Sequence, residues 1–305
     1  MGIKSFFIKP STEAFFKEAD KLPWYTRFDR LHGYVYARWT FLYIGIGTGQ
    51  HPIAKKLGPI LGMLPKGKKK KESENRGMAD EYHGKTIPLE TATQLVMVNE
   101  PVNIPDLEHV IPYNQARALI LQNPDHIVAM NCPCRSAREN PCLPLDVCLV
   151  IGEPFASFVS DHHPEKTRWI TQAEAVALIK AEDERGHVHH AFFKEAMLGR
   201  FYAICNCCSC CCGAMHAHQN GTPMLASSGF VAQVDEDLCI SCGTCEIYCQ
   251  FDALTLDGIS VVDEASCMGC GVCVSKCPER ALSLRREESK GIPLELDKLM
   301  QQAVN

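Results

Sequence analysis

The sequence predicts an α+β protein made of successive parts. Residues 86–212 mix helical periodicity with short apolar runs, which is typical of a compact α+β domain. Downstream, cysteines recur at one spacing in two copies, which indicates a small duplicated unit. Upstream, an aromatic-rich segment ends in a lysine run, which favours a boundary there. We therefore expect an N-terminal segment over 1–80, a cysteine-rich α+β domain over 81–228, the duplicated unit over 229–286 and a tail helix within 287–305.

The composition is that of a globular protein. The chain has 305 residues, of which 46% are apolar and 22% charged, enough to bury a sizeable core. Its formal net charge is −5. Phosphate binding needs a concentrated basic face, so the charge argues against a nucleic-acid partner.

The chain contains eighteen cysteines, and their use depends on the compartment. The first ten residues lack the apolar core and small-residue cleavage site of a secretory signal. No stretch reaches the ~18 consecutive apolar residues expected of a membrane span. We expect a reducing cytoplasmic location, where thiolates bind metal in preference to forming disulfides.

The N-terminal 80 residues contain one expected helix and one basic run. Ser11 or Thr12 is expected to cap a helix that continues to about Lys21 and ends before Pro23. After the aromatic stretch 34–44, five lysines follow Pro65 within residues 66–71. One interpretation of that run is a linker exposed to solvent. Alternatively, residues 34–71 dock on an acidic partner subunit or peripherally on the inner face of an anionic membrane.

The central domain should contain helices and strands in alternation. A helix is predicted over Tyr113–Gln122, and a capping box at Thr171–Glu174 begins a second helix that ends at Gly186. Short apolar runs predict strands at 126–130, 149–151, 187–190 and 201–204, and residues 214–228 read as a linker. The segment 293–300 has the apolar stripe of a short helix that something must cover.

Two cysteine runs with C-x2-C-x2-C-x3-C spacing carry the strongest chemical signal. Three cysteines at this spacing can bind three iron corners of one 4Fe-4S cluster, and the fourth cysteine of the run binds the other cluster. Zinc sites favour paired C-x2-C instead. The crossover predicts one cluster on Cys239, Cys242, Cys245 and Cys277, and a second on Cys267, Cys270, Cys273 and Cys249.

The two runs form an internal repeat with an offset of 28 residues, as the pairs Cys239/Cys267 and Cys249/Cys277 show. Each half is expected to form a strand, a ligand loop, one helical turn and a return strand. Residues 230–286 thus resemble the bacterial two-cluster ferredoxins. One departure is Gln250, which stands where the second half has Pro278.

Ten further cysteines lie upstream of the repeat, and both groups of them follow predicted strands. They are Cys132, Cys134, Cys142, Cys148, Cys205, Cys207, Cys208, Cys210, Cys211 and Cys212. Adjacent residues cannot all face one metal centre, so some should bind and others pack. We expect at least one additional iron-sulfur cluster, held by a subset of these thiols. A zinc site, or redox-active or structural thiols, are the alternatives.

The Cys132–Arg135 motif and the Cys205–Cys212 run, placed ahead of a two-cluster ferredoxin, are similar to a poorly characterised group of iron-sulfur proteins from anaerobes. That resemblance implies electron transfer in anaerobic metabolism and assigns no substrate. The same function follows from the ligands, since a 4Fe-4S cluster with four cysteines has no open coordination site.

We therefore expect an electron-transfer subunit or partner of a multi-component oxidoreductase. The sequence has no nucleotide-binding fingerprint and no catalytic constellation, so a flavoprotein partner would be a separate chain. Two alternatives are an oxidoreductase whose partly ligated upstream cluster binds substrate, and an iron-sulfur redox sensor.

Overall fold

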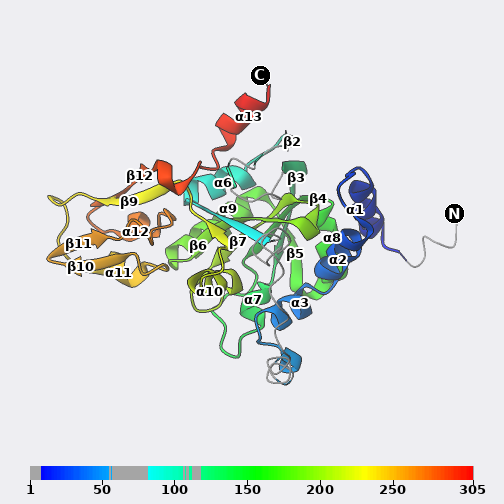
Figure 1. Ribbon diagram of the computed structural model, residues 1–305, viewed down its shortest axis with the longest axis horizontal. Coiled ribbons are helices and arrows are strands. Elements are labelled where there is room, and N and C mark those ends of the chain that lie inside the picture. Colours follow the sequence, from blue (N-terminus) through cyan, green and yellow to red (C-terminus); the bar gives the residue numbers. More distant parts are fainter. Residues whose placement is uncertain are drawn as a thin grey trace, which may run out of the picture.

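The computed structural model describes residues 8–54, 56, 82–105, 107, 110–111 and 118–304. It confirms the α+β class, with a large mixed sheet covered by helices and a smaller C-terminal unit beside it (Figure 1). The lysine run 66–71 lies outside the described residues. No helix within the described part of the chain combines the length and apolar character needed to cross a bilayer.

The large sheet has eight strands in the described residues. Its order is β2-β3-β4-β7-β6-β1-β8, and β5 pairs with β3. All pairings are antiparallel except β1 with β8. The strands are β1 (Tyr82–Ile87), β2 (Val102–Ile104), β3 (Leu119–Met130), β4 (Cys148–Glu153), β5 (Thr167–Ile170), β6 (Val188–Lys194), β7 (Arg200–Cys207) and β8 (Leu225–Ala226).

Alternate strand residues face two separate cores. Val128 and Met130 of β3 join the first core, whereas Ile127 and Ala129 join the second, as the two-residue period of a strand requires. The first core is covered by α1 (Pro10–Asp20), α2 (Arg27–Arg38), α3 (Thr40–Gly47), α8 (Phe155–His162) and α10 (Gly213–Gln219). The second is covered by α6 (Leu89–Val96), α9 (Gln172–Glu184) and α13 (Leu296–Val304).

Several predicted elements are confirmed. Helix α9 starts at the predicted capping box, in which the Thr171 side chain accepts from Glu174 N–H and the Glu174 carboxylate accepts from Thr171 N–H. The four predicted strands of the central domain lie within or overlap β3, β4, β6 and β7. The tail forms α13, whose Leu296 and Leu299 pack into the second core, so the chain itself covers the apolar stripe.

The predicted helix over Tyr113–Gln122 was wrong at its C-terminal end. Residues 113–117 lie outside the described residues, and 119–122 belong to β3. The strand pairs with β2 through Leu119 and Leu121, which are buried, while Ile120 between them is less so. A short apolar run of this kind is compatible with a strand as well as a helix, and the pairing with β2 selects the strand.

The capping role given to Ser11 or Thr12 was also wrong. The residue before α1 is Lys9, and both hydroxyl residues lie inside the helix. Ser11 Oγ donates to Asp161, and Thr12 Oγ1 is 2.8 Å from His162 Nε2. These side chains therefore attach α1 to α8. Residues 214–228, expected as a linker, instead contain α10 and β8.

The C-terminal unit has the expected duplicated fold. β9 (Phe230–Val234) pairs with β12 (Leu282–Arg286), and β10 (Leu254–Asp257) pairs with β11 (Ile259–Val262). The helical turns are α11 (Thr244–Tyr248) and α12 (Val272–Lys276). Positive φ angles repeat at the 28-residue offset, in the pairs Gly243/Gly271, Ser241/Gly269 and Asp252/Arg280.

Candidate iron-sulfur and metal sites

The first predicted cysteine set surrounds one small cavity. Cys239, Cys242, Cys245 and Cys277 all line it, together with Ile240 and Leu256. Cys277 thus leaves its own half of the repeat and joins the three cysteines of the first half. Cys242 is exposed, and Ile240 has 62% of its surface accessible, so this cavity faces outward.

The second predicted set surrounds a separate cavity on the side toward the large sheet. Cys249, Cys267, Cys270 and Cys273 line it. The neighbouring Met268 belongs to the first core of the sheet. Burial raises the pKa of Cys270 to about 12, so a metal must compensate the cost of its charged thiolate. The structure therefore has an outer and an inner four-cysteine site in the C-terminal unit, the inner one next to the large sheet.

Backbone N–H groups point at the sulfurs, as iron-sulfur ligation requires. Ala253 N donates to Cys249 Sγ at 3.2 Å, and Ala281 N donates to Cys277 Sγ at 3.3 Å, at the same offset of the repeat. Ala232 N donates to Cys267 Sγ at 3.4 Å. Such bonds stabilise negative charge on the thiolate and are among the factors that set cluster potential. The donor set and its surroundings thus fit two 4Fe-4S clusters.

Gly269 lets the inner loop approach the sheet closely. Its φ is +62°, and a Cβ there would lie 2.2 Å from the carbonyl oxygen of Phe230. Ser228 Oγ donates to the Gly269 carbonyl at 2.7 Å. A side chain at this position would therefore displace the ligand loop from β9.

None of the eighteen cysteines, all of which lie in the described residues, forms a disulfide. The ten upstream cysteines lie on two loops and on the ends of the strands β4 and β7 beside them. The two loops meet because β4 pairs with β7, with Cys148 opposite Cys205. One loop follows β3 and contains α7 (Pro133–Ser136), and the other follows β7. The thiols fall into two groups of different size and burial.

The first group is a thiol quartet formed by Cys142, Cys208, Cys210 and Cys211, whose sulfurs all lie within 4.8 Å of one another. The Cys142 and Cys210 sulfurs are 3.1 Å apart. Burial alone would raise the pKa of Cys211, but hydrogen bonds from the Cys142 backbone and from the neighbouring thiols hold that pKa below its usual value. The quartet lies near the surface, where Cys210 is exposed.

The second group is a thiol sextet that lines a larger cavity, to which Cys208 and Cys211 of the quartet also contribute. It consists of Cys132, Cys134, Cys148, Cys205, Cys207 and Cys212. Arg135 N–H donates to Cys132 Sγ and Gly213 N–H donates to Cys134 Sγ, each at 3.5 Å. The neighbouring thiols of Cys132 and Cys205, together with burial, raise the pKa of Cys148 well above its usual value. Buried thiols of raised pKa are poor nucleophiles, because the thiolate is the reactive form.

The cavity that the sextet lines has a volume of about 340 Å³, and residues of α2 and α3 also line it. Tyr36 of α2 and Tyr202 of β7 line it, with their hydroxyl groups 2.9 Å apart. The Lys194 ammonium, which also lines it, lies 3.7 Å from the Tyr36 ring centroid. A space of this size exceeds what packing defects leave and falls in the range of small-molecule sites.

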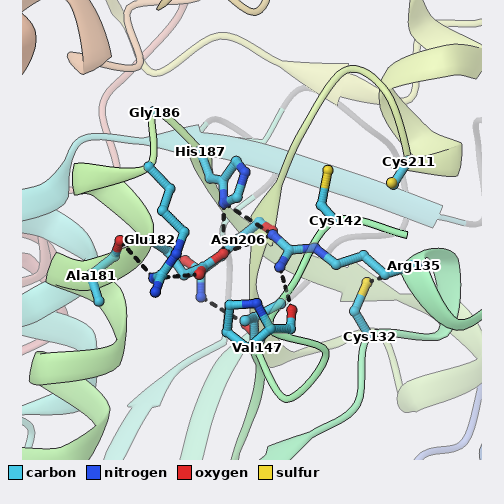
Figure 2. Close-up of polar contacts among 12 residues, drawn as sticks. Cys132, Arg135, Cys142, Val147, Ala181, Glu182, Gly186, His187, Asn206 and Cys211 are labelled. Carbon is cyan, nitrogen blue, oxygen red and sulfur yellow. Dashed lines mark hydrogen bonds and ion pairs between the residues drawn. The ribbon is translucent and has the colours of Figure 1, made fainter. Parts of the chain in front are cut away.

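Arg135, which follows Cys134, fixes the first cysteine loop. Figure 2 shows its guanidinium reaching from that loop to Glu182 and His187. Nη2 is 2.7 Å from Glu182 Oε2, and both side chains are only 1% exposed. Burial alone would lower the pKa of Arg135, but the Glu182 carboxylate raises it. Nη1 and Nη2 also donate to the carbonyl oxygens of Pro144 and Asn206, at 2.6 and 3.1 Å.

Three site residues have roles that the sequence does not reveal. Arg135 belongs to the cysteine motif, and its buried partner Glu182 falls inside the helix predicted to end at Gly186. Gln250 stands out in the sequence only as a missing proline. Its side chain bonds Ser209 and Gly186, so it connects the inner four-cysteine site to the quartet loop. The absence of proline at this position was the one available signal.

Comparison with known families supports the assignment of the C-terminal unit. Residues 232–284 match the family described as 4Fe-4S dicluster domain. A comparison with curated proteins finds no match. The chain is therefore an iron-sulfur protein with a C-terminal dicluster domain. Upstream, the sulfurs of the quartet lie close enough together to hold one metal ion.

Proposed function

We propose that this protein is an electron-transfer subunit or partner of a multi-component oxidoreductase in anaerobic metabolism. One observation carries the proposal: two four-cysteine cavities lie in the C-terminal unit, one facing outward and one facing the cysteine-rich domain. A 4Fe-4S cluster with four cysteine ligands exchanges single electrons and has no open site for substrate. The protein's own contribution is to hold the thiolates, to donate N–H groups to them, and to present one site to a partner.

The surface around the outer site suits a redox protein with a basic docking face. From Asp235 to Ser275 the chain has acidic side chains and no lysine or arginine. Apolar side chains stand exposed among them, namely Leu238, Ile240, Ile247, Leu256 and Val261. An apolar centre with a charged rim is typical of transient recognition, and the negative charge would speed association with a positive partner. A flavoprotein is a candidate partner of this kind.

We propose that the sextet holds an additional iron-sulfur cluster. Its six thiols exceed the four that one cubane needs, and backbone N–H groups point at two of them. The dicluster domain and the sextet would then bind about twelve iron atoms and twelve sulfides per chain, at four of each per cubane.

The test is a count of iron and acid-labile sulfide on the full chain, purified without oxygen, followed by a reductive titration read by electron paramagnetic resonance. We expect about twelve of each and reversible uptake of electrons without any added substrate. About eight iron and eight sulfide would restrict the clusters to the dicluster domain. Failure to take up electrons reversibly would exclude the electron-transfer function.

The cavity of about 340 Å³ favours a second candidate, an oxidoreductase whose sextet cluster is partly ligated and contacts substrate. Tyr36, Tyr202 and Lys194 would then supply hydrogen-bond donors and a positive charge to a small anionic substrate. Carbon monoxide and cyanide bind iron that has an open position. A change in the sextet's resonance signal on their addition would support this enzyme, whereas an unchanged signal would support pure electron transfer.

A further inference from the structure

The thiol quartet is too compact for the cluster type that the dicluster domain holds. In tetrahedral zinc sites each metal–sulfur bond is ~2.3 Å, which places neighbouring sulfurs about 3.8 Å apart. The quartet sulfurs all lie within 4.8 Å of one another, with the Cys210 and Cys211 sulfurs 3.7 Å apart and the Cys142 and Cys210 sulfurs closer, at 3.1 Å. The size of the quartet therefore matches one tetrahedral ion with four thiolate ligands.

The dicluster cysteines offer an internal comparison. In a cubane each cysteine binds a different iron corner, so its ligand sulfurs stand further apart than those around a single ion. Among the described residues, which include all eighteen cysteines, only the quartet gathers at least three sulfurs within 4.8 Å of one another. The cysteine sets of the outer and inner sites are wider. The same structure thus distinguishes two kinds of thiolate site.

The surroundings of the quartet fit a doubly negative four-thiolate centre. Arg138 donates from Nε and Nη2 to the carbonyl oxygen of Cys211, at 3.3 and 3.1 Å. Arg138 therefore places a positive charge beside a site whose four thiolates would carry two more negative charges than one divalent ion neutralises. The charge of the buried Arg135 is already paired with Glu182, at 2.7 Å.

The quartet also lies where a metal would join separate parts of the chain. Cys142 comes from the loop after α7, and the other three cysteines come from the loop after β7. Ser209, inside that second loop, donates its N–H to Gln250 of the dicluster domain. An ion bound here would fix both loops and the surface that the dicluster domain contacts.

We propose that the quartet binds a single thiophilic divalent ion, Zn²⁺ or Fe²⁺, in tetrahedral coordination, which leaves the sextet as the upstream cluster site. The ten upstream cysteines then serve two sites of different nuclearity. This proposal concerns only the quartet, so it stands whether or not the protein transfers electrons.

The test compares the full chain with a Cys142→Ser/Cys210→Ser variant, both purified without oxygen. Metal analysis should show the loss of one zinc or iron atom per chain and no loss of acid-labile sulfide. Ser209→Ala is the matched control inside the same loop and should keep all metal. Loss of about four iron atoms and four sulfides, or no loss of any metal, would overturn the proposal.

A measurement on the unaltered protein guards against misfolding of the variant. X-ray absorption at the zinc edge should give four sulfur neighbours at about 2.3 Å and no metal neighbour. If the bound ion is iron, the metal count shows it, and the oxidised protein should carry one isolated high-spin ferric signal. A short metal–metal distance at a zinc site, or an iron count in strict one-to-one ratio with sulfide and no zinc, would refute the single-ion site.

Discussion

The side-chain oxygen of Gln250 accepts a hydrogen bond of 2.8 Å from the backbone N–H of Ser209, and its amide nitrogen donates to the Gly186 carbonyl at 3.0 Å. Gln250 follows Cys249 of the inner site, and Ser209 separates two cysteines of the quartet. A covalent and hydrogen-bonded connection between the two regions therefore passes through this one side chain. Proline, which stands at the equivalent position in the second half, could make neither bond.

Replacing Gln250 by proline should loosen the contact without removing any thiol. The Ser209 N–H would lose its acceptor, at a cost of about 1 kcal/mol or somewhat more. Hydrogen–deuterium exchange should rise in the peptide that covers residues 207–212. Pro278→Ala, at the matching position of the second half, is the control and should leave that peptide unchanged. Equal exchange in both variants would mean that Gln250 does not hold the quartet loop.

The crossover of ligands can be tested by the thiols that each loss exposes. In Cys277→Ala the outer site loses one ligand, so Cys239, Cys242 and Cys245 should become open to alkylation under anaerobic conditions. In Cys249→Ala, the matched variant, the newly alkylated residues should be the cysteines of the inner site. Mass spectrometry of the alkylated peptides distinguishes the two patterns. If Cys267, Cys270 and Cys273 were alkylated in Cys277→Ala instead, Cys277 would be a ligand of the inner site and the crossover would be wrong.

The sequence could predict the dicluster unit because its information is local and repeated. Short loops limit where Cys239, Cys242 and Cys245 can lie, and the second copy repeats the same restriction. The division of the upstream cysteines into quartet and sextet does not depend on local spacing. Cys142 meets Cys210 across 68 positions of sequence, and that meeting depends on the pairing of β4 with β7. Spacing alone does not contain this information.

The burial of two charged side chains could not be predicted from the sequence either. Arg135 and Glu182 both occur in patterns that suit an exposed surface, yet each side chain is 1% exposed in the folded chain. The helix prediction failed at residues 119–122 for a related reason. Their side chains are compatible with a helix or a strand, and pairing with β2 selects the strand. Tertiary contacts determined each outcome that local patterns left open.

Removal of Arg135 should be among the most damaging single changes outside the cysteines. Arg135→Met leaves the buried Glu182 carboxylate with only His187 and Arg185 as partners, and the loss of one member of a buried ion pair typically costs about 3–5 kcal/mol. Denaturant unfolding of the anaerobic protein should show it. Arg185→Ala removes the exposed partner of the same carboxylate and should cost at most about 1 kcal/mol. Adding Glu182→Leu to Arg135→Met should recover part of the loss, and the absence of any recovery would contradict an ion-pair origin.

Lys85 should make stability depend on pH. It is buried in β1, where its ammonium donates to the Ile292 carbonyl at 2.8 Å. Burial, with the nearby charge of Arg286, lowers the pKa of Lys85 to about 7. Unfolding restores the usual pKa near 10.5, so between these values the unfolded chain binds more protons. The Lys85 contribution to the free energy of unfolding therefore rises as pH increases from 7 toward 10.

Lys85→Met should remove that rise. The free energy of unfolding can be measured by urea denaturation at pH 7 and pH 9. It should increase less in the variant than in the natural chain between the two pH values. Lys298→Met, at an exposed lysine of α13, is the control and should keep the full pH dependence. An unchanged pH dependence in Lys85→Met would show that this lysine is not the source.

The last prediction concerns residues 34–71 and membrane docking. Trp39, which precedes α3, and Leu42 and Ile46 within α3 have spacings that suit one side of a helix, and each is more than 40% exposed. Phe28 and Leu31 of α2 are more exposed still. The lysine run 66–71 lies outside the described residues, but it follows this segment closely in the chain. An apolar segment that is followed in the sequence by several lysines favours binding to an anionic lipid surface, where each lysine contributes ~1 kcal/mol.

The full chain should sediment with anionic liposomes at low salt and dissociate as salt rises, because screening weakens the lysine contribution. Leu42→Glu/Ile46→Glu should reduce binding by placing charge in the apolar contact. Ile247→Glu, at an exposed apolar residue of the dicluster domain, is the matched control and should bind as the natural chain does. Binding that ignores salt and lipid charge, or no binding at low salt, would rule out the membrane and leave the linker or an acidic partner subunit as the role of the lysine run.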